Sequence, residues 1–465
     1  MRDRGQLLAA LLVLAAVLAA ASRVERGVGV RPLGAATPPD VPSGAWLCPH
    51  GGGEGWDVRV SLANPGPDPV LARIRSIGAG RPGAPEERVV PPGSTTQVTV
   101  PGDGREASTV VEYFGGFVAA GFLELAGEDA NGTAAEPCLP EAGTRWLLPD
   151  GSGERGFDDV VVVMNPLPAP AVVTLTVFSE GRDPVRTEAW TNVTIRPNHA
   201  RAFRLDQVAL GEATAATLVE AEIGRVAAAT LGVSTAGGVR AAVGVPGGVE
   251  TQILPGGEDA GRTDLAVAAT TEDRVGLSGE LLGPTGRQAL PAVADASPRP
   301  ASATTVTLTT TGPAGIVAHA DGPGVAFARR TFGVVADQGS TTGAAEPARA
   351  WILLPSVIGE PAHPQIALAN AGPSPISVTL RTLPALPAEE GAALSRATVR
   401  VPAGATVLAP RGFVAQAAGD GVLAVSEGGT FVPVSASYAL GREGWATYAV
   451  AVGVPVPERW IPDGV

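Results

Sequence analysis

A chain of 465 residues with a formal charge of -13 is long enough for three or four domains of ordinary size. Its basic residues are all Arg and form no cluster longer than a pair, which excludes the concentrated positive charge of a nucleic-acid-binding surface. Gly and Pro together make up about a fifth of the chain, below the level typical of disorder, so we expect folded domains of short elements.

The first residues are typical of a secretory signal peptide or an N-terminal membrane anchor. Arg2 and Arg4 precede an apolar run, Leu7 to Ala21, that ends in small residues. As a helix this run would reach only about 23 Å, short of the roughly 30 Å hydrocarbon core, which favours cleavage but leaves anchoring open. Residues 1–22 are therefore predicted to direct export out of the cytoplasm, and residues 23–44 to form an extended linker.

Three markers recur along the rest of the chain with a period of roughly 100 residues. A Trp opens three units, and Gln252 stands where the Trp of the third unit would be; the three are Trp46, Trp146 and Trp351. An Asn begins a Pro-rich corner in the same three units, with a degenerate copy expected at residues 265–271; these are Asn64, Asn165 and Asn370. A Gly precedes an apolar run late in each unit, at Gly116, Gly224, Gly324 and Gly429.

The period predicts four units, namely residues 45–143, 144–250, 251–350 and 351–465. Each has about seven short runs of β-branched residues separated by Gly, Pro, Asn or Asp, and almost no segment has a helical period. This pattern favours an all-β fold of antiparallel β-sandwiches of immunoglobulin size. A propeller blade would need only about 40 to 50 residues, so the longer period disfavours that architecture. The third unit is expected to be degenerate, with a weaker core.

The recurring Trp and Asn residues have a structural interpretation and a functional one. A Trp at a fixed place in each unit is expected to fill the core, although it could instead stack against a sugar. The Asn is expected to bond its own backbone in a turn. The Trp460-Ile461-Pro462 segment repeats the opening signature with no unit after it, so we predict that it forms a strand that completes the fourth unit.

Two cysteines, Cys48 and Cys138, lie near opposite ends of the first unit. In an exported chain such a pair is most simply a structural disulfide. Closing a loop of about 90 residues would contribute roughly 4 to 5 kcal/mol in the chain-entropy model. The alternative, a reactive thiol or metal pair, lacks His or Cys partners nearby.

No strong catalytic, cofactor or metal motif accompanies this architecture. The four histidines, His50, His199, His319 and His363, do not have metal-ligand spacing to a Cys, Asp or Glu. Acidic pairs such as Asp158-Asp159 flank turns or strands, and the chain has no phosphate-binding, dinucleotide or nucleophile-elbow pattern. Glu128, Asp129 and Asn131 could offer oxygen ligands to Ca²⁺ but lack the EF-hand pattern. We therefore expect no catalytic, cofactor-binding or metal-binding residues and no cofactor.

Several of these motifs together resemble an exported actinobacterial family of unknown function, the domain-of-unknown-function family 5719. The motifs are Trp146-Leu147-Leu148-Pro149, Asn165-Pro166-Leu167-Pro168, Pro92-Gly93-Ser94-Thr95 and Gly224-Arg225-Val226-Ala227-Ala228, behind an apolar N-terminus. The likeness covers almost the whole chain, although the third unit departs from it. The resemblance implies an envelope protein of tandem sandwiches whose family genes lie beside glycosyltransferase genes, and hence an association with envelope polysaccharide assembly.

Three functional hypotheses remain open. The first is a non-enzymatic, exported or membrane-tethered spacer or scaffold of the cell envelope. The second is a carbohydrate-binding surface protein, which coplanar exposed aromatic side chains would favour. The third is a hydrolase, which two carboxylates about 5 to 9 Å apart in a cleft would favour. Envelope proteins or glycans are the expected partners, nucleic acid is not, and membrane contact is expected only through the N-terminal segment.

Overall fold

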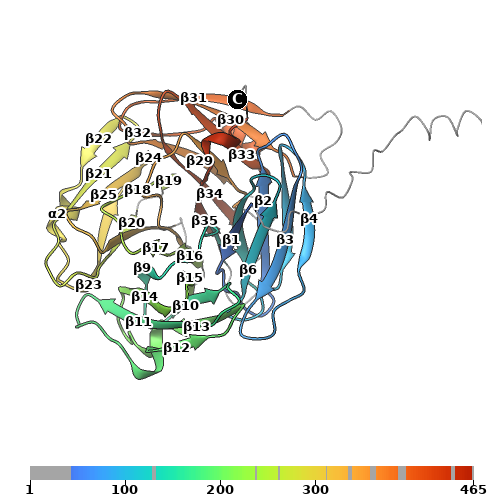
Figure 1. Ribbon diagram of the computed structural model, residues 1–465. Coiled ribbons are helices and arrows are strands. Elements are labelled where there is room, and N and C mark those ends of the chain that lie inside the picture. Colours follow the sequence, from blue (N-terminus) through green and yellow to red (C-terminus); the bar gives the residue numbers. More distant parts are fainter. Residues whose placement is uncertain are drawn as a thin grey trace, which may run out of the picture. The chain divides into compact units, whose positions relative to one another are not determined.

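Antiparallel β-sheets account for almost all regular structure in the computed structural model (Figure 1). The structure describes residues 43–127, 132–235, 238–259, 262–310, 312–332, 338–356, 363–385, 394–440 and 446–462. The predicted signal or anchor segment, residues 23–42 of the predicted linker, and Glu128, Asp129 and Asn131 lie outside these ranges. Apart from one two-stranded sheet, the described sheets have four or five strands each, two sheets to a repeat, which confirms the predicted β-sandwich fold class.

Four successive modules share one strand order, which we describe with the letters a to h in chain order. Strands a, f, c and d form one sheet, and strands e, b, g and h form the other, so each module has eight main strands where the sequence predicted about seven. Module 1 contains β1 (Gly44–Cys48), β2 (Asp57–Asn64), β3 (Val70–Ile77), β4 (Glu86–Val90), β5 (Ser94–Val100), β6 (Ser108–Phe114), β7 (Ala119–Leu125) and β8 (Thr133–Pro137). Module 2 contains β9 (Arg145–Gly151), β10 (Phe157–Asn165), β11 (Ala171–Ser179), β12 (Val193–Ile195), β13 (His199–Arg204), β14 (Ala215–Ile223), β15 (Ala227–Ser234) and β16 (Val239–Val243).

The remaining two modules repeat the order with short additions. Module 3 contains β18 (Thr251–Leu254), β20 (Arg262–Ala269), β21 (Leu277–Gly283), β22 (Gly286–Ala289), β23 (Ser302–Thr309), β25 (Gly315–Ala320), β26 (Val325–Phe332) and β27 (Gln338–Thr341). Module 4 contains β28 (Ala350–Leu353), β29 (His363–Asn370), β30 (Ile376–Leu383), β31 (Arg396–Val401), β32 (Ala405–Leu408), β33 (Gly421–Glu427), β34 (Val432–Leu440) and β35 (Ala446–Val452). The additions are strands β17 (Val245–Pro246), β19 (Glu258–Asp259), β24 (Gly312–Pro313) and β36 (Val454–Pro455), helices α2 (Pro291–Asp295) and α3 (Arg411–Gln416), and 3-10 turns η1 (Glu188–Trp190), η2 (Leu205–Gln207) and η3 (Glu458–Trp460).

Side-chain burial explains why these segments form strands. Strand β3 buries Val70, Ala72 and Ile74 and leaves the residues between them partly exposed, as a sheet with one covered face requires. Strand β10 instead buries every residue from Val160 to Met164. Its outer face is covered because Val162 lies beside Gly51 of module 1, so its apolar run is unbroken.

The Trp that opens a module joins its two sheets. The indole Nε1 of each Trp on strand a donates to a backbone carbonyl just before strand g: Trp46 to Val118 at 2.6 Å, Trp146 to Val226 at 2.6 Å and Trp351 to Phe431 at 2.7 Å. In module 3 the Gln252 side chain donates to the Phe327 carbonyl at 3.0 Å and accepts the Phe327 amide at 2.7 Å. Gln252 therefore keeps the cross-sheet bond although it lacks the aromatic volume.

The corner Asn residues are fully buried and bond only to nearby backbone. Asn165 donates to the carbonyls of Ala169, Ile195 and Arg196, and its Oδ1 accepts the amide of Leu167. The other two corners have matching bonds, centred on Asn64 and Asn370. A buried side chain with this many backbone partners serves the turn.

A return segment closes each module by pairing with the residue after the opening Trp or Gln. The four pairs are Leu139 with Leu47, Val245 with Leu147, Ala344 with Ile253, and Val454 with Ile352. The prediction that Trp460-Ile461-Pro462 forms the closing strand was wrong, because β36 closes module 4 and Trp460 ends the 3-10 turn η3. Pro455, Pro457 and Pro462 lack the amide that a continuing strand would need.

The modules follow a closed cycle of contacts. The h strands meet in sequence, since β8 contacts β16 and β35, and β27 also contacts both of these strands. The Gly315 amide of module 3 donates to the Thr406 hydroxyl of module 4 at 2.9 Å, and the Gly421 amide of module 4 donates to the Thr95 hydroxyl of module 1 at 3.2 Å. The last and first modules therefore contact each other in the same way as modules 3 and 4.

One turn carries backbone strain in module 3. The residue before strand e has a positive φ in all four modules, at Gly93 (58°), Asn198 (54°), Ala301 (47°) and Gly404 (63°). Gly and Asn adopt this left-handed region readily, but the Cβ of Ala makes it costly by about 1 to 2 kcal/mol.

We therefore predict that Ala301→Gly raises the free energy of unfolding by up to about 1 kcal/mol, because relief of the strain exceeds the added entropy of the unfolded chain. The reciprocal change Gly93→Ala, which meets no atom within 4 Å, should lower it by about 1 kcal/mol. Denaturant titration measures both, and Ala84→Gly, at an exposed Ala without positive φ, is the control. A loss of stability in Ala301→Gly as large as in that control would contradict the prediction.

Candidate binding cavity

A cavity of about 590 Å³ lies where the ends of the h strands and the return segments converge. Its walls include residues 137–140 of module 1, residues 343–346 of module 3 and residues 452–455 of module 4, and Val243 of module 2 also lines it. The volume falls within the range of small-molecule sites, about 300 to 1,000 Å³. Because every module contributes to it, this cavity is a product of the closed cycle.

Three aromatic side chains of module 1 form one wall. The ring centroids of Trp46 and Phe117 are 6.4 Å apart and those of Tyr113 and Phe117 are 6.2 Å apart, both in edge-to-face geometry. Gly44 makes room for this wall, since a Cβ there would lie 2.2 Å from the Tyr113 hydroxyl oxygen. Edge-to-face packing fixes the rings relative to one another, so the wall is preformed.

Module 4 supplies the opposite aromatic residues. Trp351 is almost fully buried and Trp460 is half-buried, and both line the cavity. The guanidinium of Arg459 lies 5.8 Å from the centroid of the Trp460 ring, within range of a cation–π interaction. Trp460 and Ile461 pack against the core cluster that contains Trp46 and Val454, which anchors this segment.

The cavity offers few polar side chains, namely Ser43, Tyr113, Glu346 and Arg459. Burial raises the pKa of Tyr113 above its ordinary value, although the positive charge of Arg459 acts in the opposite direction. The Tyr113 hydroxyl is therefore protonated at neutral pH and can donate a hydrogen bond. A cavity with aromatic and aliphatic walls and a few polar groups is typical of a site for an apolar ligand.

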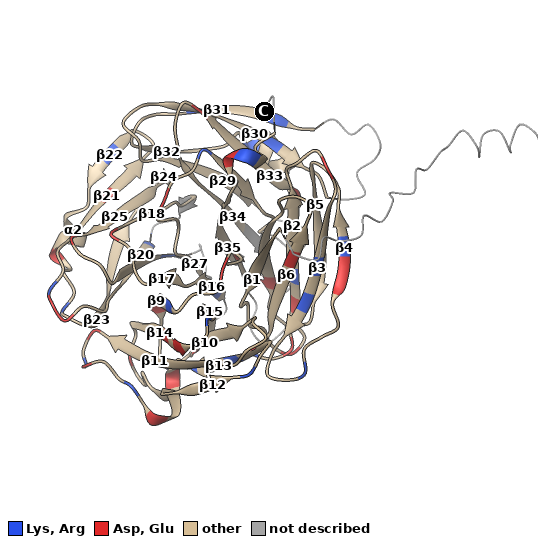
Figure 2. Ribbon diagram, viewed as in Figure 1, with Lys and Arg blue, Asp and Glu red and all other residues tan. Residues whose placement is uncertain are grey.

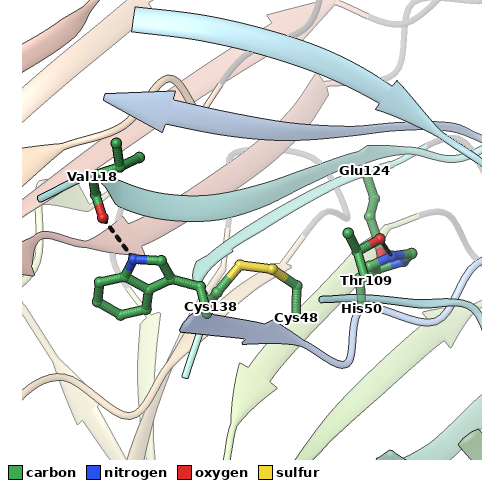
Figure 3. The surroundings of a disulfide bond; sticks show 7 residues. Cys48, His50, Thr109, Val118, Glu124 and Cys138 are labelled. Carbon is green, nitrogen blue, oxygen red and sulfur yellow. Dashed lines mark hydrogen bonds and ion pairs between the residues drawn. A yellow bond between two sulfur atoms is a disulfide. The ribbon is translucent and has the colours of Figure 1, made fainter. Parts of the chain in front are cut away.

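The disulfide adjoins this cavity. Cys48 of β1 and Cys138 of the first return segment are joined, with the two Cα atoms 4.6 Å apart, and Cys138 lines the cavity (Figure 3). Next to it, the amides of Leu47 and Leu139 each donate to the other's carbonyl at 2.8 Å. The covalent bond and the two hydrogen bonds together hold the first return segment in place.

A buried His–Glu pair lies on the other side of the disulfide (Figure 3). His50 Nδ1 lies 2.7 Å from the Gly51 carbonyl, which can only accept, so Nδ1 carries the proton, and Nε2 accepts from the Thr109 hydroxyl at 3.0 Å. Burial lowers the pKa of His50 to about 4 and raises the pKa of Glu124, whose Oε1 lies 3.7 Å from Nδ1. His50 is therefore neutral at pH 7, and neither side chain has solvent-exposed surface, so this pair serves the core.

Charged residues of both signs are spread over the strands and loops (Figure 2), and four of them form a buried cluster between modules 2 and 3. Arg330 of module 3 bonds to Asp150 of module 2, and Arg240 bonds to Asp159 and lies 3.3 Å from Asp150. Although burial alone would raise the pKa of Asp150, Arg330 and Arg240 hold it well below its ordinary range. Burial raises the pKa of Asp159. These paired charges join two modules, and they would be costly to separate.

The residues that the sequence singled out thus lie in different parts of the fold. Trp146 lies in the core away from the cavity, as the structural interpretation expected, whereas Trp46 and Trp351 belong to core clusters and also line the cavity. Phe117 begins the recurring apolar run after Gly116, whereas Tyr113 and Arg459 had no signal in the sequence, because they share the cavity only through the contact between modules 1 and 4. Among the described residues, no group of three His, Cys, Asp or Glu side chains could hold a metal ion. The helices found in the described ranges are all too short or too polar to cross a membrane.

The pKa of His50 gives a pH-dependent prediction. An unfolded His has a pKa of about 6.5, so a folded value of about 4 means that the folded state loses stability as pH falls through this window. A shift of about 2.5 units corresponds to roughly 3 kcal/mol. We compare the free energies of unfolding of wild type and His50→Gln at each pH. The difference, wild type minus variant, should fall by about this amount between pH 7 and pH 4. The contribution of Glu124 has the opposite sign, but it is present in both proteins.

NMR provides the direct measurement. The imidazole signal that disappears in His50→Gln should titrate near pH 4 in the folded wild type. A signal that titrates near the unfolded value of about 6.5 would show that the imidazole is accessible to solvent, contrary to the structure.

Comparison with known proteins places the chain in a family but gives it no activity. No curated protein matches it. One solved structure with some similarity is described as "Crystal structure of tetra-tandem repeat in extending region of large adhesion protein". Its sequence is 11% identical, and the match covers 86% of this chain and 95% of that chain. The TM-score of 0.09 is too low for this similarity to carry an argument. The model of the family of unknown function DUF5719 matches residues 115–411, which is more than half of the chain. The protein therefore belongs to the family of unknown function DUF5719.

Proposed function

We propose that this protein is an exported, non-enzymatic binding scaffold of the cell envelope, and that the cavity between its modules holds an apolar ligand. The observation that carries the proposal is the cavity itself: segments from four modules converge on one preformed space with aromatic walls. Sites with these properties are the usual places where proteins bind small molecules.

The closed cycle of contacts supports a scaffold over an extended spacer. A spacer made of independent sandwiches would need no contact between its first and last modules, but here the Thr95 amide of module 1 donates to the Pro384 carbonyl of module 4 at 2.9 Å. The disulfide between Cys48 and Cys138 supports an oxidising location outside the cytoplasm.

The other two hypotheses have less support. Sugar binding requires many polar partners, but the indole N–H groups of Trp46 and Trp351 already bond to backbone carbonyls. Hydrolysis by the pair Asp158-Asp159 has little support, because Asp158 pairs with Arg105 at 2.7 Å and Asp159 bonds to Arg240. Both carboxylates already serve ion pairs within the fold.

A neutral fluorescent probe tests the proposal. N-phenyl-1-naphthylamine should bind at one site per chain, with the rise in fluorescence that follows transfer from water to an apolar environment. Ala345 lines the cavity and is exposed, so Ala345→Trp should fill the space without disturbing the core and should abolish binding. Ala84→Trp, a matched change at an exposed Ala that does not line the cavity, should bind as wild type does. Equal binding by Ala345→Trp and wild type, or no binding by either, would refute the proposal.

A further inference from the structure

Two hydrogen-bond donors that line the cavity have no protein acceptor. Within the described part of the chain, neither the Tyr113 hydroxyl nor the Arg459 guanidinium has a hydrogen bond or ion pair with another residue, while both side chains line the same space. The positive charge of Arg459 lowers the pKa of Tyr113, against the larger effect of burial, which raises it. Two hydrogen-bond donors on the wall of one cavity, one of them charged, offer a site for an anion.

Packing holds the Tyr113 hydroxyl in position, while Arg459 is exposed to solvent beside the Trp460 ring. Tyr113 lies edge-to-face against Phe117, with its hydroxyl over Gly44, and Arg459 follows Pro457 in a 3-10 turn and lies against the ring of Trp460. Because Tyr113 is held in this way, it loses little conformational freedom on binding, so more of its interaction energy appears as affinity.

The neighbouring carboxylates are directed to other cations. Glu458, which precedes Arg459, pairs with Arg349 at 3.4 Å, and Glu112, which precedes Tyr113, lies 3.8 Å from Arg73. Glu346 and Arg459 both line the cavity and are both exposed to solvent, where an ion pair is weak, and no ion pair joins them in the described part of the chain. The charge of Arg459 is therefore left for a ligand.

We infer that the ligand is an amphiphile with one acidic group, whose anion binds Tyr113 and Arg459 while its apolar body lies against Trp46, Trp351 and Val452. This inference rests on the proposed function, to which it adds the chemical class of the ligand. The apolar body gains by burial against the aromatic and aliphatic walls. The acid gains a charge-assisted hydrogen bond, which a neutral amphiphile of the same length cannot form.

Three probes with the same alkyl group test the inference: dodecanoate, dodecanol and dodecylamine. Each is titrated into the full-length protein by calorimetry, at concentrations below micelle formation. Dodecanoate should bind about tenfold or more tightly than dodecanol, and dodecylamine should be the weakest. Arg459→Gln should weaken dodecanoate about tenfold and leave dodecanol unchanged, while Arg459→Lys should keep most of the preference. Tyr113→Phe should reduce the preference with little effect on dodecanol. Thermal melts of each variant check that the fold is retained.

The outcomes separate the inference from the proposed function. Equal binding of dodecanoate and dodecanol, or an Arg459→Gln variant that binds dodecanoate as wild type does, overturns the anionic class and leaves apolar binding in place. Tighter binding of dodecylamine, lost in Glu346→Gln, would show a site for cationic amphiphiles and also overturns it. Loss of all three probes with N-phenyl-1-naphthylamine still bound overturns only this inference, whereas loss of that neutral probe as well refutes the proposed function.

Discussion

One hydrogen bond recurs in every module, from the opening side chain of strand a to a backbone carbonyl at the start of strand g. It joins the two sheets of the sandwich at the end where the return segment pairs with strand a. A Trp suits this place because its large ring excludes water and its single N–H finds a buried acceptor. Gln252 shows which part of that role is indispensable: module 3 keeps the cross-sheet bond and gives up the aromatic volume. An unpaired backbone carbonyl in the core would cost more than a smaller core side chain.

The sequence predicted the properties that depend on local pattern. Alternating β-branched residues and turn residues predicted sandwiches, the buried Asn165 and its neighbours explain the recurring corner, and the structure joins the two cysteines that the sequence paired. The closed cycle could not be predicted, because its contacts are made by small residues with no pattern of their own. The Thr95 hydroxyl and the Gly421 amide are 326 residues apart in sequence, and neither the Pro92-Gly93-Ser94-Thr95 motif nor the residues around Gly421 indicate that the two meet.

The candidate site illustrates the same limit. The sequence predicted that the opening Trp residues fill the core or stack against a sugar, but Trp46 and Trp351 are buried in core clusters and also line a cavity. Tyr113 and Arg459 carry the proposed chemistry, and each is unremarkable in its own segment. Only the contact between modules 1 and 4 brings them to one space, so a search for motifs within single modules cannot find the site.

The order of the modules explains why the cavity takes most of its walls from modules 1 and 4. Between consecutive modules, the chain passes from a return segment to the next opening side chain in seven residues, as from Leu139 to Trp146 or from Ala344 to Trp351. The chain does not run from module 4 into module 1, so the residues after Val454 are free of that covalent constraint. They form the turn η3 instead, and Trp460 and Ile461 pack on the core cluster that contains Trp46. The junction without a covalent connection can therefore keep an open space, which Trp46 of module 1 and Trp460 of module 4 line.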